Sequence, residues 1–520
     1  MSLVTHPPLS SLLRRRTAPD TGKSGGSDPA GAQPVPCPRP ELLRRLRDAV
    51  PDATLLSQPE ELRPYECDGL TAYREIPLVV AIPDSVAQVQ EILRICRALR
   101  VPVIPRGAGT GLSGGALPDR GGVLLSMTRF RKILQVDPLN RSARVEPGVT
   151  NREISEAAAP YGLFYAPDPS SEIACTIGGN IAENAGGLHC LKYGLTVHNV
   201  LSVKILTPEG ESLTLGGEAL DAAGFDLLAL FIGSEGLLGV VVEATVRLLP
   251  RPPQARLIVA GFPSVETAAK AVGQLIGTGF IPAGLEMMDN LAIRAAEEFV
   301  HAGYPVEAAA LLLCEFDGLP EEVEEQAGLA EKQLRESGAY FLRLSSSEEE
   351  RLLLWKGRKS AFPAAGRMAP DYYCMDGTIP RRRLPEALLR IARLSEEYRL
   401  PVANVFHAGD GNLHPLILYD ASRPDELKRA ERLGSRILEL CVEMGGVITG
   451  EHGVGVEKLD QMCIQFRAPE LVQFHRIKEA FDPDGILNPG KAIPMLHRCA
   501  ELGAMHVHHG KVPFPEIERF

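Results

Sequence analysis

A glycine-rich loop early in the chain excludes one common nucleotide-binding fold. Residues 109–114 match the spacing G-x-G-x-x-G. In the doubly wound dinucleotide fold, this loop leads directly into a helix whose N-terminus faces the pyrophosphate. Here Pro118 and the pair Gly121-Gly122 separate the loop from the next apolar strand, so no continuous helix can follow. Two interpretations of the loop remain: a series of sharp turns without a ligand, or a cradle of backbone N–H groups that binds an anionic phosphate.

A second glycine-rich region favours the phosphate cradle. It comprises residues 166–171, 175–180 and 184–187 and lies in the same predicted domain as the first loop. Arg106 adds a cation immediately before the first loop. Two such regions are typical of a domain that wraps a large dinucleotide with several loops.

The length of 520 residues predicts two or three domains. The run Pro250-Arg251-Pro252-Pro253 is the clearest boundary. We expect a disordered tail over 1–40, a first domain over 41–250, a second over 254–495 and a docking tail over 496–520. Strands are predicted at 78–82, 101–104, 122–127, 257–262 and 309–316, and helices at 85–99, 264–277 and 320–337. Strands and helices in this mixture predict an α+β protein.

Charge, hydropathy and cysteine spacing exclude several classes of protein. A net charge of -11 argues against a general nucleic-acid binder. No run approaches the 18 or so apolar residues of a membrane span. The ten cysteines include no Cys-x-x-Cys pair, which fits a reducing compartment and argues against an iron–sulfur cluster in this chain.

Three histidines and a glutamate near the end of the chain suggest a metal site. If Asp410-Gly411 is the two-residue loop of a hairpin, His407 pairs with His414 and their Cβ atoms lie about 4.5–5.5 Å apart on one face. Glu451 could supply a third ligand and His452 a neighbouring base. By themselves these residues fit a hydrolytic metal site equally well, or a hydrogen-bonded pair of turns.

Together the motifs resemble the FAD-linked oxidases of the vanillyl-alcohol oxidase type, in order and spacing over about residues 45–495. The matching segments are 105–115, 167–171, 176–180, 233–239, 407–414, 450–453 and 488–491. Within the family, segments 355–363, 370–378 and 505–510 are most similar to the FAD-linked catalytic subunits of bacterial glycolate oxidases. The resemblance implies a PCMH-type FAD-binding domain, a ferredoxin-like substrate domain and a C-terminal helical segment.

The resemblance also implies a non-covalent FAD, because Thr110 and Ser113 stand where members with a histidyl link carry histidine. Cys175 is then a packing residue rather than a flavin linkage. The residues expected to bind FAD are Pro105, Arg106, Gly107, Ala108, Gly109, Thr110, Gly111, Ser113, Pro167, Asp168, Ser171, Thr176, Gly178, Gly179, Asn180, Asn184, Gly186, Gly187, Tyr193, Glu235, Gly239, Val240 and Asn488.

The implied activity is oxidation of a small 2-hydroxy acid, glycolate to glyoxylate or D-lactate to pyruvate, by hydride transfer to the flavin. His407, His414 and Glu451 would bind a divalent zinc, manganese, iron or cobalt ion, and His452 would take the hydroxyl proton. Arg358 would pair with the substrate carboxylate, unless it is an ordinary surface arginine. Cys374 stands where relatives acting on dicarboxylates carry lysine, which favours a monocarboxylic substrate.

The resemblance further implies partners: a second FAD-type subunit and an iron–sulfur subunit. We expect a cytoplasmic location, or a peripheral one at the inner membrane through this complex. The alternatives are a stand-alone D-lactate or D-2-hydroxyglutarate dehydrogenase and a catalytically silent FAD-binding assembly subunit. The tail histidines His506, His508 and His509 fit a docking tail better than a metal site, because no carboxylate or cysteine stands at ligand spacing.

Overall fold

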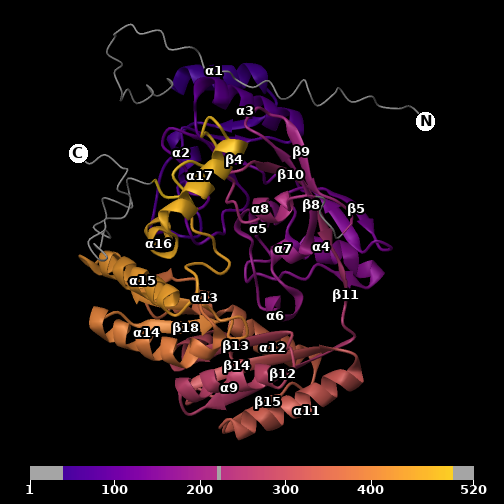
Figure 1. Cartoon of the computed structure of the whole chain (residues 1–520), viewed down its shortest axis with the longest axis vertical. Coiled ribbons are helices and arrows are strands. Elements are labelled where there is room, and N and C mark those ends of the chain that lie inside the picture. Colours follow the sequence, from indigo (N-terminus) through magenta and orange to yellow (C-terminus); the bar gives the residue numbers. More distant parts are fainter. Residues whose placement is uncertain (1–38, 220–223, 496–520) are drawn as a thin grey trace. The chain divides into compact units, whose positions relative to one another are not determined.

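The computed structural model describes residues 39–219 and 224–495, which fall in one compact unit (Figure 1). The predicted tails at 1–40 and 496–520 lie almost wholly outside the described residues, as do the three tail histidines.

The first half of the chain begins with a four-stranded sheet. Its strands run in the order β1-β2-β4-β3, and β2, β4 and β3 are parallel. Apolar residues of α1 and α3 pack on one face, and Leu62 of α2 packs on the other. Ser85 occupies the N-cap position of α3, as the sequence predicts. The bounds are α1 Arg39–Ala49, β1 Thr54–Leu56, α2 Pro59–Leu62, β2 Val79–Ile82, α3 Val86–Leu99, β3 Val103–Arg106 and β4 Val123–Ser126.

A five-stranded antiparallel sheet follows, in the order β5-β6-β10-β8-β9. Several short helices lie between the strands of this sheet. The helix α5 begins within the second glycine-rich region because the Thr176 side chain caps the Gly179 N–H. The bounds are β5 Ile133–Asp137, β6 Ser142–Val145, α4 Asn151–Ala158, β7 Leu163–Phe164, α5 Ile177–Glu183, α6 Cys190–Tyr193, α7 Thr196–Asn199, β8 Val200–Leu206, β9 Ser212–Gly216, α8 Leu227–Phe231, β10 Val240–Arg247 and β11 Leu249–Pro250.

The second half is built on a seven-stranded sheet in the order β15-β12-β14-β13-β18-β20-β16. Along the chain, its first four strands and the helices α9 and α11 form the ferredoxin-like pattern β-α-β-β-α-β, with the helix α10 inserted between β13 and β14. The predicted α+β fold class is therefore confirmed. The bounds are β12 Gln254–Phe262, α9 Val265–Gly277, β13 Gly284–Asp289, α10 Asn290–Val300, β14 Ala310–Gly318, α11 Pro320–Glu336 and β15 Phe341–Leu344.

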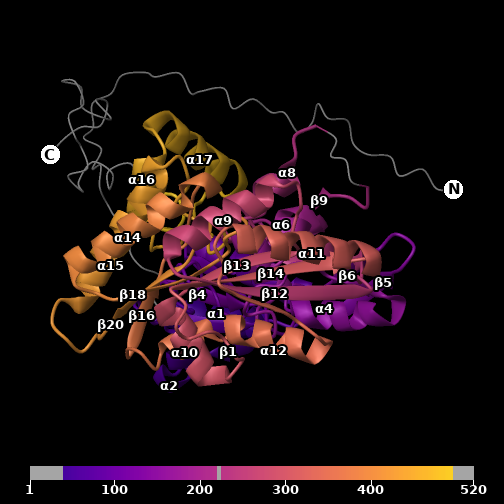
Figure 2. The same cartoon turned by 90° about the horizontal axis from the view of Figure 1, so that it is seen from below.

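Alternate residues of this sheet enter two separate cores. Ile258 and Ala260 face α9, α11, α14 and α15, whereas Leu257 and Val259 face α10, α12 and α13. Figure 2 shows α9 and α11 on one side of the strands and α10 and α12 on the other. The remaining bounds are α12 Glu348–Lys359, α13 Ala361–Ala365, β16 Asp371–Cys374, β17 Gly377–Thr378, α14 Leu384–Tyr398, β18 Val402–Phe406, β19 Asn412–Leu413, β20 Pro415–Tyr419 and α15 Glu426–Glu443.

The chain finally returns to the first half through α16 (Leu459–Gln465) and α17 (Ala468–Phe481). Leu487 pairs in parallel with Val103 of β3, and two backbone hydrogen bonds of 2.8 Å flank that pair. The last described residues therefore extend the first sheet, so both halves contribute to the loops between them.

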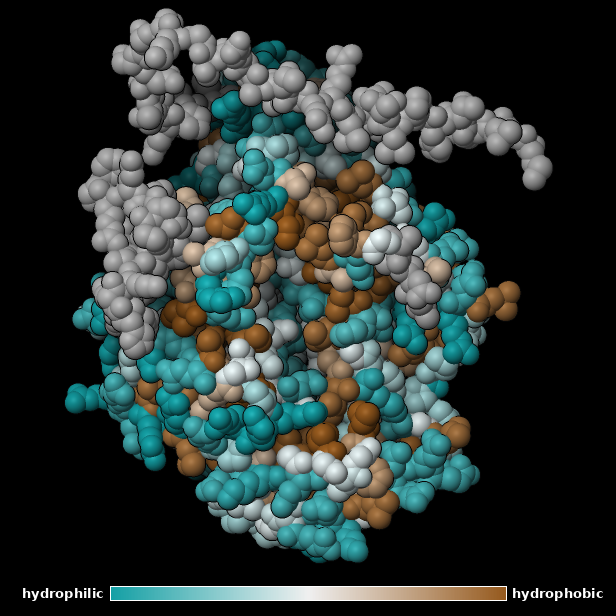
Figure 3. All heavy atoms as spheres, viewed as in Figure 1, coloured by the Kyte–Doolittle hydropathy of each residue, from teal (hydrophilic) through white to brown (hydrophobic). Residues whose placement is uncertain are grey.

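The surface in Figure 3 shows apolar residues gathered over α8 and β9, where Leu213, Leu227 and Leu230 are exposed. No helix in the described ranges is long and apolar enough to cross a membrane.

Candidate active site

A cavity of about 430 Å³ joins the two glycine-rich regions to the histidine cluster. Both predicted sets therefore meet in one place, although they come from opposite ends of the chain. The predicted residues that line the cavity are Pro105, Arg106, Gly107, Ala108, Gly109, Thr110, Gly111, Ser171, Thr176, Gly178, Gly179, Asn180, Glu235, Gly239, Val240, Arg358, His407, His414, Glu451 and His452.

Other residues expected to contact FAD stand behind the cavity wall. The Tyr193 hydroxyl donates to Asp317, and Asp168 binds the half-buried His189 ring. The Asn184 side chain instead accepts the Val197 N–H, because a left-handed backbone ends α5 at this residue. The predicted FAD contacts not found in the lining are Ser113, Pro167, Asp168, Asn184, Gly186, Gly187, Tyr193 and Asn488.

The glycine loops fit a cradle for a bulky phosphate-bearing ligand. A Cβ atom on Gly107 would lie 2.2 Å from Thr176 Oγ1, and one on Gly178 would lie 2.7 Å from Pro147. Arg106 supports the first loop, since its guanidinium donates to the Cys67 carbonyl at 2.7 Å and packs against Gly109. These neighbours leave no room for a Cβ atom, which explains why glycine is needed at these positions.

The buried carboxylate of Glu235 connects the first half of the chain to the turn that carries Glu451. Glu235 accepts the backbone N–H groups of Val454 and Gly455 at 2.6 and 2.7 Å. Glu183 lies close by, with an oxygen 2.0 Å from where a Gly453 Cβ would stand. Burial raises the pKa of both glutamates, and the charge of Glu235 raises that of Glu183 further. Glu235 therefore ties the turn that carries Glu451 to the first half of the chain.

The predicted hairpin register is wrong by two residues. His407 pairs with Asn412, not with His414, and a four-residue loop over 408–411 replaces the two-residue turn. The Gly411 N–H bonds back to the His407 carbonyl with Gly411 at φ 77°, and β19 leaves to pair with β17. Because a shift of two residues keeps each side chain on its face, His407 and His414 remain diagonal neighbours with ring centroids 5.1 Å apart.

The predicted ligand set comes together around one carboxylate oxygen. Glu451 Oε1 lies 3.2 Å from His407 Nε2 and 3.0 Å from His414 Nε2. The Nε2 atom of His414 is buried and makes no hydrogen bond within the described part of the chain. The three ligand atoms lie within 4.8 Å of one another, so these residues fit a divalent cation with open positions.

Each histidine is oriented through its other ring nitrogen. His407 Nδ1 lies 2.7 Å from Glu286 Oε1, and His414 Nδ1 lies 3.2 Å from the Met375 carbonyl. This arrangement presents both Nε2 atoms to Glu451, as in carboxylate–histidine–metal sites. Burial opposes charge on His407, yet Glu286 and Glu451 raise its pKa well above the usual value. The two carboxylates therefore favour a positive charge at His407.

Arg358 lines the cavity but is not an ordinary surface arginine. It is 1% exposed, and its Nη2 donates to Glu286 Oε2 at 2.6 Å. Its Nε and Nη1 atoms are buried without a hydrogen-bond partner in the described residues. Arg358 can therefore offer either of these nitrogens to a carboxylate while its Nη2 supports Glu286.

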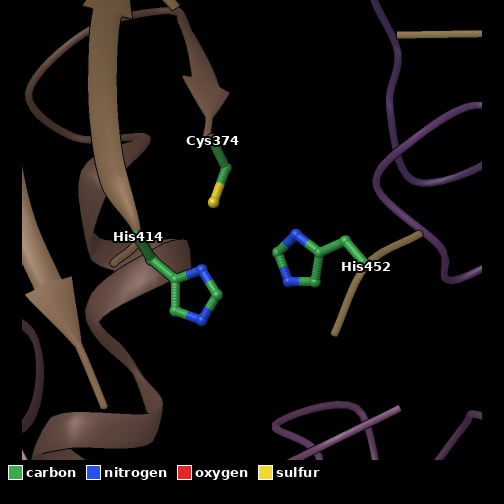
Figure 4. Close-up of side chains that lie close together, drawn as sticks. All are labelled: Cys374, His414 and His452. Atoms are coloured by element: carbon green, nitrogen blue, oxygen red, sulfur yellow. The ribbon is translucent and has the colours of Figure 1, made fainter. Parts of the chain in front are cut away.

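His452 stacks on His414, with centroids 4.9 Å apart and planes 14° from parallel. Its Nε2 lies 3.7 Å from Glu451 Oε1, and burial lowers its pKa to about 4. The ring is thus neutral near pH 7 and can accept a proton. Figure 4 shows the two rings side by side with Cys374.

The backbone around Glu451 and His452 is held by an ion pair that the sequence analysis did not identify. Asp376 accepts the N–H groups of Gly450 and His452 at 3.0 and 2.9 Å, and Lys458 Nζ lies 3.1 Å from it. Asp376 and Lys458 are both 0% exposed. Asp376 therefore positions a predicted ligand and the predicted base together.

Glu286 was also missed, although the sequence carries a signal for it. It is a carboxylate flanked by the apolar residues Leu285 and Met287 in the buried strand β13. A charged side chain within a buried strand needs an oppositely charged or hydrogen-bonding partner. Such buried pairs often lie at functional sites.

Two family models match the chain: "FAD binding domain" over residues 77–216 and "FAD linked oxidases, C-terminal domain" over residues 251–492. The chain belongs to the FAD-linked oxidases. It is 64% identical to the glycolate oxidase subunit GlcD of Escherichia coli (strain K12) over 93% of this chain and 97% of that protein.

More distant relatives share the same architecture. A probable mitochondrial D-lactate dehydrogenase of Danio rerio is 32% identical over 82% of this chain and 86% of that protein. The crystal structure of p-cresol methylhydroxylase matches with a TM-score of 0.74 at 18% identity, over 88% of this chain and 97% of that one. At that identity the likeness concerns the fold, which is the PCMH-type fold expected from the sequence.

Proposed function

We propose that this FAD-linked oxidase converts glycolate to glyoxylate and acts on other short 2-hydroxy acids such as D-lactate. The observation that carries the proposal is the single cavity that joins the FAD-side glycine loops to His407, His414 and Glu451. The high identity to a glycolate oxidase subunit supports the choice of substrate.

His452 is the proposed base for the substrate hydroxyl. Its low pKa keeps the ring unprotonated at neutral pH, and it lies at the edge of the Glu451 cluster. Arg358 is the proposed partner of the substrate carboxylate through one of its unpaired nitrogens. FAD, when bound non-covalently, supplies the hydride acceptor.

We also propose that His407, His414 and Glu451 hold a divalent zinc, manganese or iron ion. A ligand set of two imidazoles and one carboxylate accepts each of these metals. When bound, the ion would polarise the substrate oxygens as a Lewis acid. The Glu286 carboxylate and the Met375 carbonyl keep both imidazoles turned toward Glu451, whatever the metal.

The second candidate is a D-lactate or D-2-hydroxyglutarate dehydrogenase that acts alone. The Danio rerio relative, a probable D-lactate dehydrogenase, supports D-lactate as its substrate. The presence of His452 and of the complete cluster of His407, His414 and Glu451 argues against a catalytically silent assembly subunit. As part of a complex, the chain would pass electrons to a second FAD-type subunit and an iron–sulfur subunit, in the cytoplasm or at the inner membrane surface.

Anaerobic flavin reduction tests the proposal. The purified chain is mixed in turn with glycolate, D-lactate, L-lactate and D-2-hydroxyglutarate, and bleaching of the oxidised flavin band is followed. Fastest bleaching by glycolate supports the proposal, and a preference for the dicarboxylate refutes it. His452→Gln should slow bleaching by about 10²–10⁴-fold if this ring is the base. The matched control is His475→Gln on α17, since that ring bonds the Pro494 carbonyl instead.

A further inference from the structure

His414 and His452 belong to a second set of possible metal ligands. Besides the set around Glu451, the described residues contain the group Cys374, His414 and His452, whose ligand atoms also lie within 4.8 Å of one another. In Figure 4 the Cys374 sulfur points toward the space between the two rings. The two sets share His414, and the second set also contains the proposed base.

The stacked rings have a nitrogen available for this second set. The nearly parallel planes of His414 and His452 lie face to face, with ring centroids 4.9 Å apart. His452 Nδ1 is buried and has no hydrogen-bond partner among the described residues. The Cys374 thiol, 4% exposed at the end of β16, donates a weak hydrogen bond of 3.4 Å to the Met375 carbonyl. His414 Nδ1 lies 3.2 Å from that same carbonyl, which places sulfur and imidazole beside each other.

The two sets differ in chemical preference. The Glu451 set offers two nitrogens and an oxygen, whereas the Cys374 set offers two nitrogens and a sulfur. A thiolate ligand favours soft cations such as cadmium and zinc, and oxygen ligands favour harder cations such as manganese. Because both sets need His414, one cation at the second set competes with one at the first.

We propose that Cys374, His414 and His452 form a second, inhibitory site for thiophilic divalent cations. Binding replaces the thiol proton, which passes to solvent, and forms sulfur–metal and nitrogen–metal bonds without any change of oxidation state. The cation then occupies a nitrogen of the base His452 and draws His414 from the Glu451 set. The inhibitory part of this proposal rests on the proposed function, whereas the binding part does not.

The test uses the FAD-loaded enzyme with cadmium as the probe. Cadmium binding is read from the ultraviolet absorption of the cadmium–thiolate bond, and inhibition from glycolate oxidation relative to each variant's own rate without cadmium. The test variant is Cys374→Ser, and the matched control is Cys314→Ala, because Cys314 is buried in β14 away from the cluster. Manganese is the matched control cation.

The wild type and Cys314→Ala should show the same absorption and the same inhibition. Cys374→Ser should lose the ultraviolet absorption that corresponds to one cadmium–thiolate bond. It should also require at least about tenfold more cadmium for half inhibition. Manganese should affect all three proteins alike. Equal absorption in wild type and Cys374→Ser overturns the site. Absorption lost without a change in inhibition overturns the claim that the site captures His452. If glycolate is not a substrate, the absorption change still tests the site separately from the proposed function.

Discussion

Replacing Glu286 by glutamine tests whether the two histidines are held in place for a cation. Glu286 is 1% exposed, orients His407 through Oε1 and pairs with Arg358 through Oε2. Glutamine keeps the size of the side chain but loses its charge. Loss of a carboxylate that orients a metal ligand typically weakens metal binding about 10–100-fold, or roughly 1.4–2.8 kcal/mol. We expect a loss of that size for Glu286→Gln.

The same change should destabilise the fold by a second route. Arg358 would keep its buried charge without the carboxylate that now balances it, and two of its nitrogens already lack hydrogen bonds. Breaking one partner of a buried ion pair destabilises a protein by about 3–5 kcal/mol. The double variant Glu286→Gln/Arg358→Met removes both charges. It should recover most of the stability without recovering metal affinity.

The two effects are separated by two assays. Metal affinity is measured by competition with a chromophoric chelator, and stability by the urea midpoint of the apoprotein. If Glu286→Gln binds metal as tightly as the wild type, Glu286 does not orient a ligand. If the double variant regains wild-type affinity, the loss in the single variant came from destabilisation and the orienting role is refuted.

Three further predictions concern residues around the cavity. Burial alone would lower the pKa of His189, but Asp168 and Glu315 raise it well above its usual value. The protonated ring therefore stabilises the fold fully below about pH 6.5, and this stabilisation is lost as the pH rises through the raised pKa. His189→Ala should lower the urea midpoint more at pH 6 than at pH 10. Burial raises the pKa of Glu457 to about 7, so Glu457→Gln should improve stability relative to the wild type by up to roughly 3 kcal/mol at pH 8 but not at pH 4, as followed by urea unfolding. The Asn488 amide donates to two backbone carbonyls at 2.9 and 2.6 Å beside the FAD-side loops, so Asn488→Ala should weaken FAD binding to the apoprotein by at least about tenfold in a flavin fluorescence titration.

The ligand cluster could be predicted because its signals are local. Short polar motifs within glycine turns place His407, His414 and Glu451 on two loops, and the family resemblance indicates that the loops meet. The hairpin register failed because an Asp-Gly pair alone does not fix loop length. The strand leaving the turn pairs with β17, more than 30 residues earlier in the chain, and this long-range pairing decides the register.

The partners of the supporting residues could not be predicted for the same reason. Glu286 and His407 are 121 residues apart, and Asp376 and Glu451 are 75 residues apart. A single sequence contains no pairing information over such separations. Tyr193 shows the opposite error: the resemblance transfers a residue's identity but not the direction of its side chain. Here the hydroxyl turns to Asp317 instead of the cavity.

The turn that carries Glu451 and His452 is fixed from both halves of the protein at once. On one side, Asp376 at the end of the substrate-side sheet binds the N–H groups of that turn. On the other, Glu235 of the FAD-binding half binds the next two N–H groups along the chain, at Val454 and Gly455. Charge-assisted hydrogen bonds of this kind are about twice as strong as neutral ones. Because a hydride donor and acceptor react only when held at close range, a turn tied to both halves sets the distance between the proposed base and the FAD-side loops without relying on closure of the cavity.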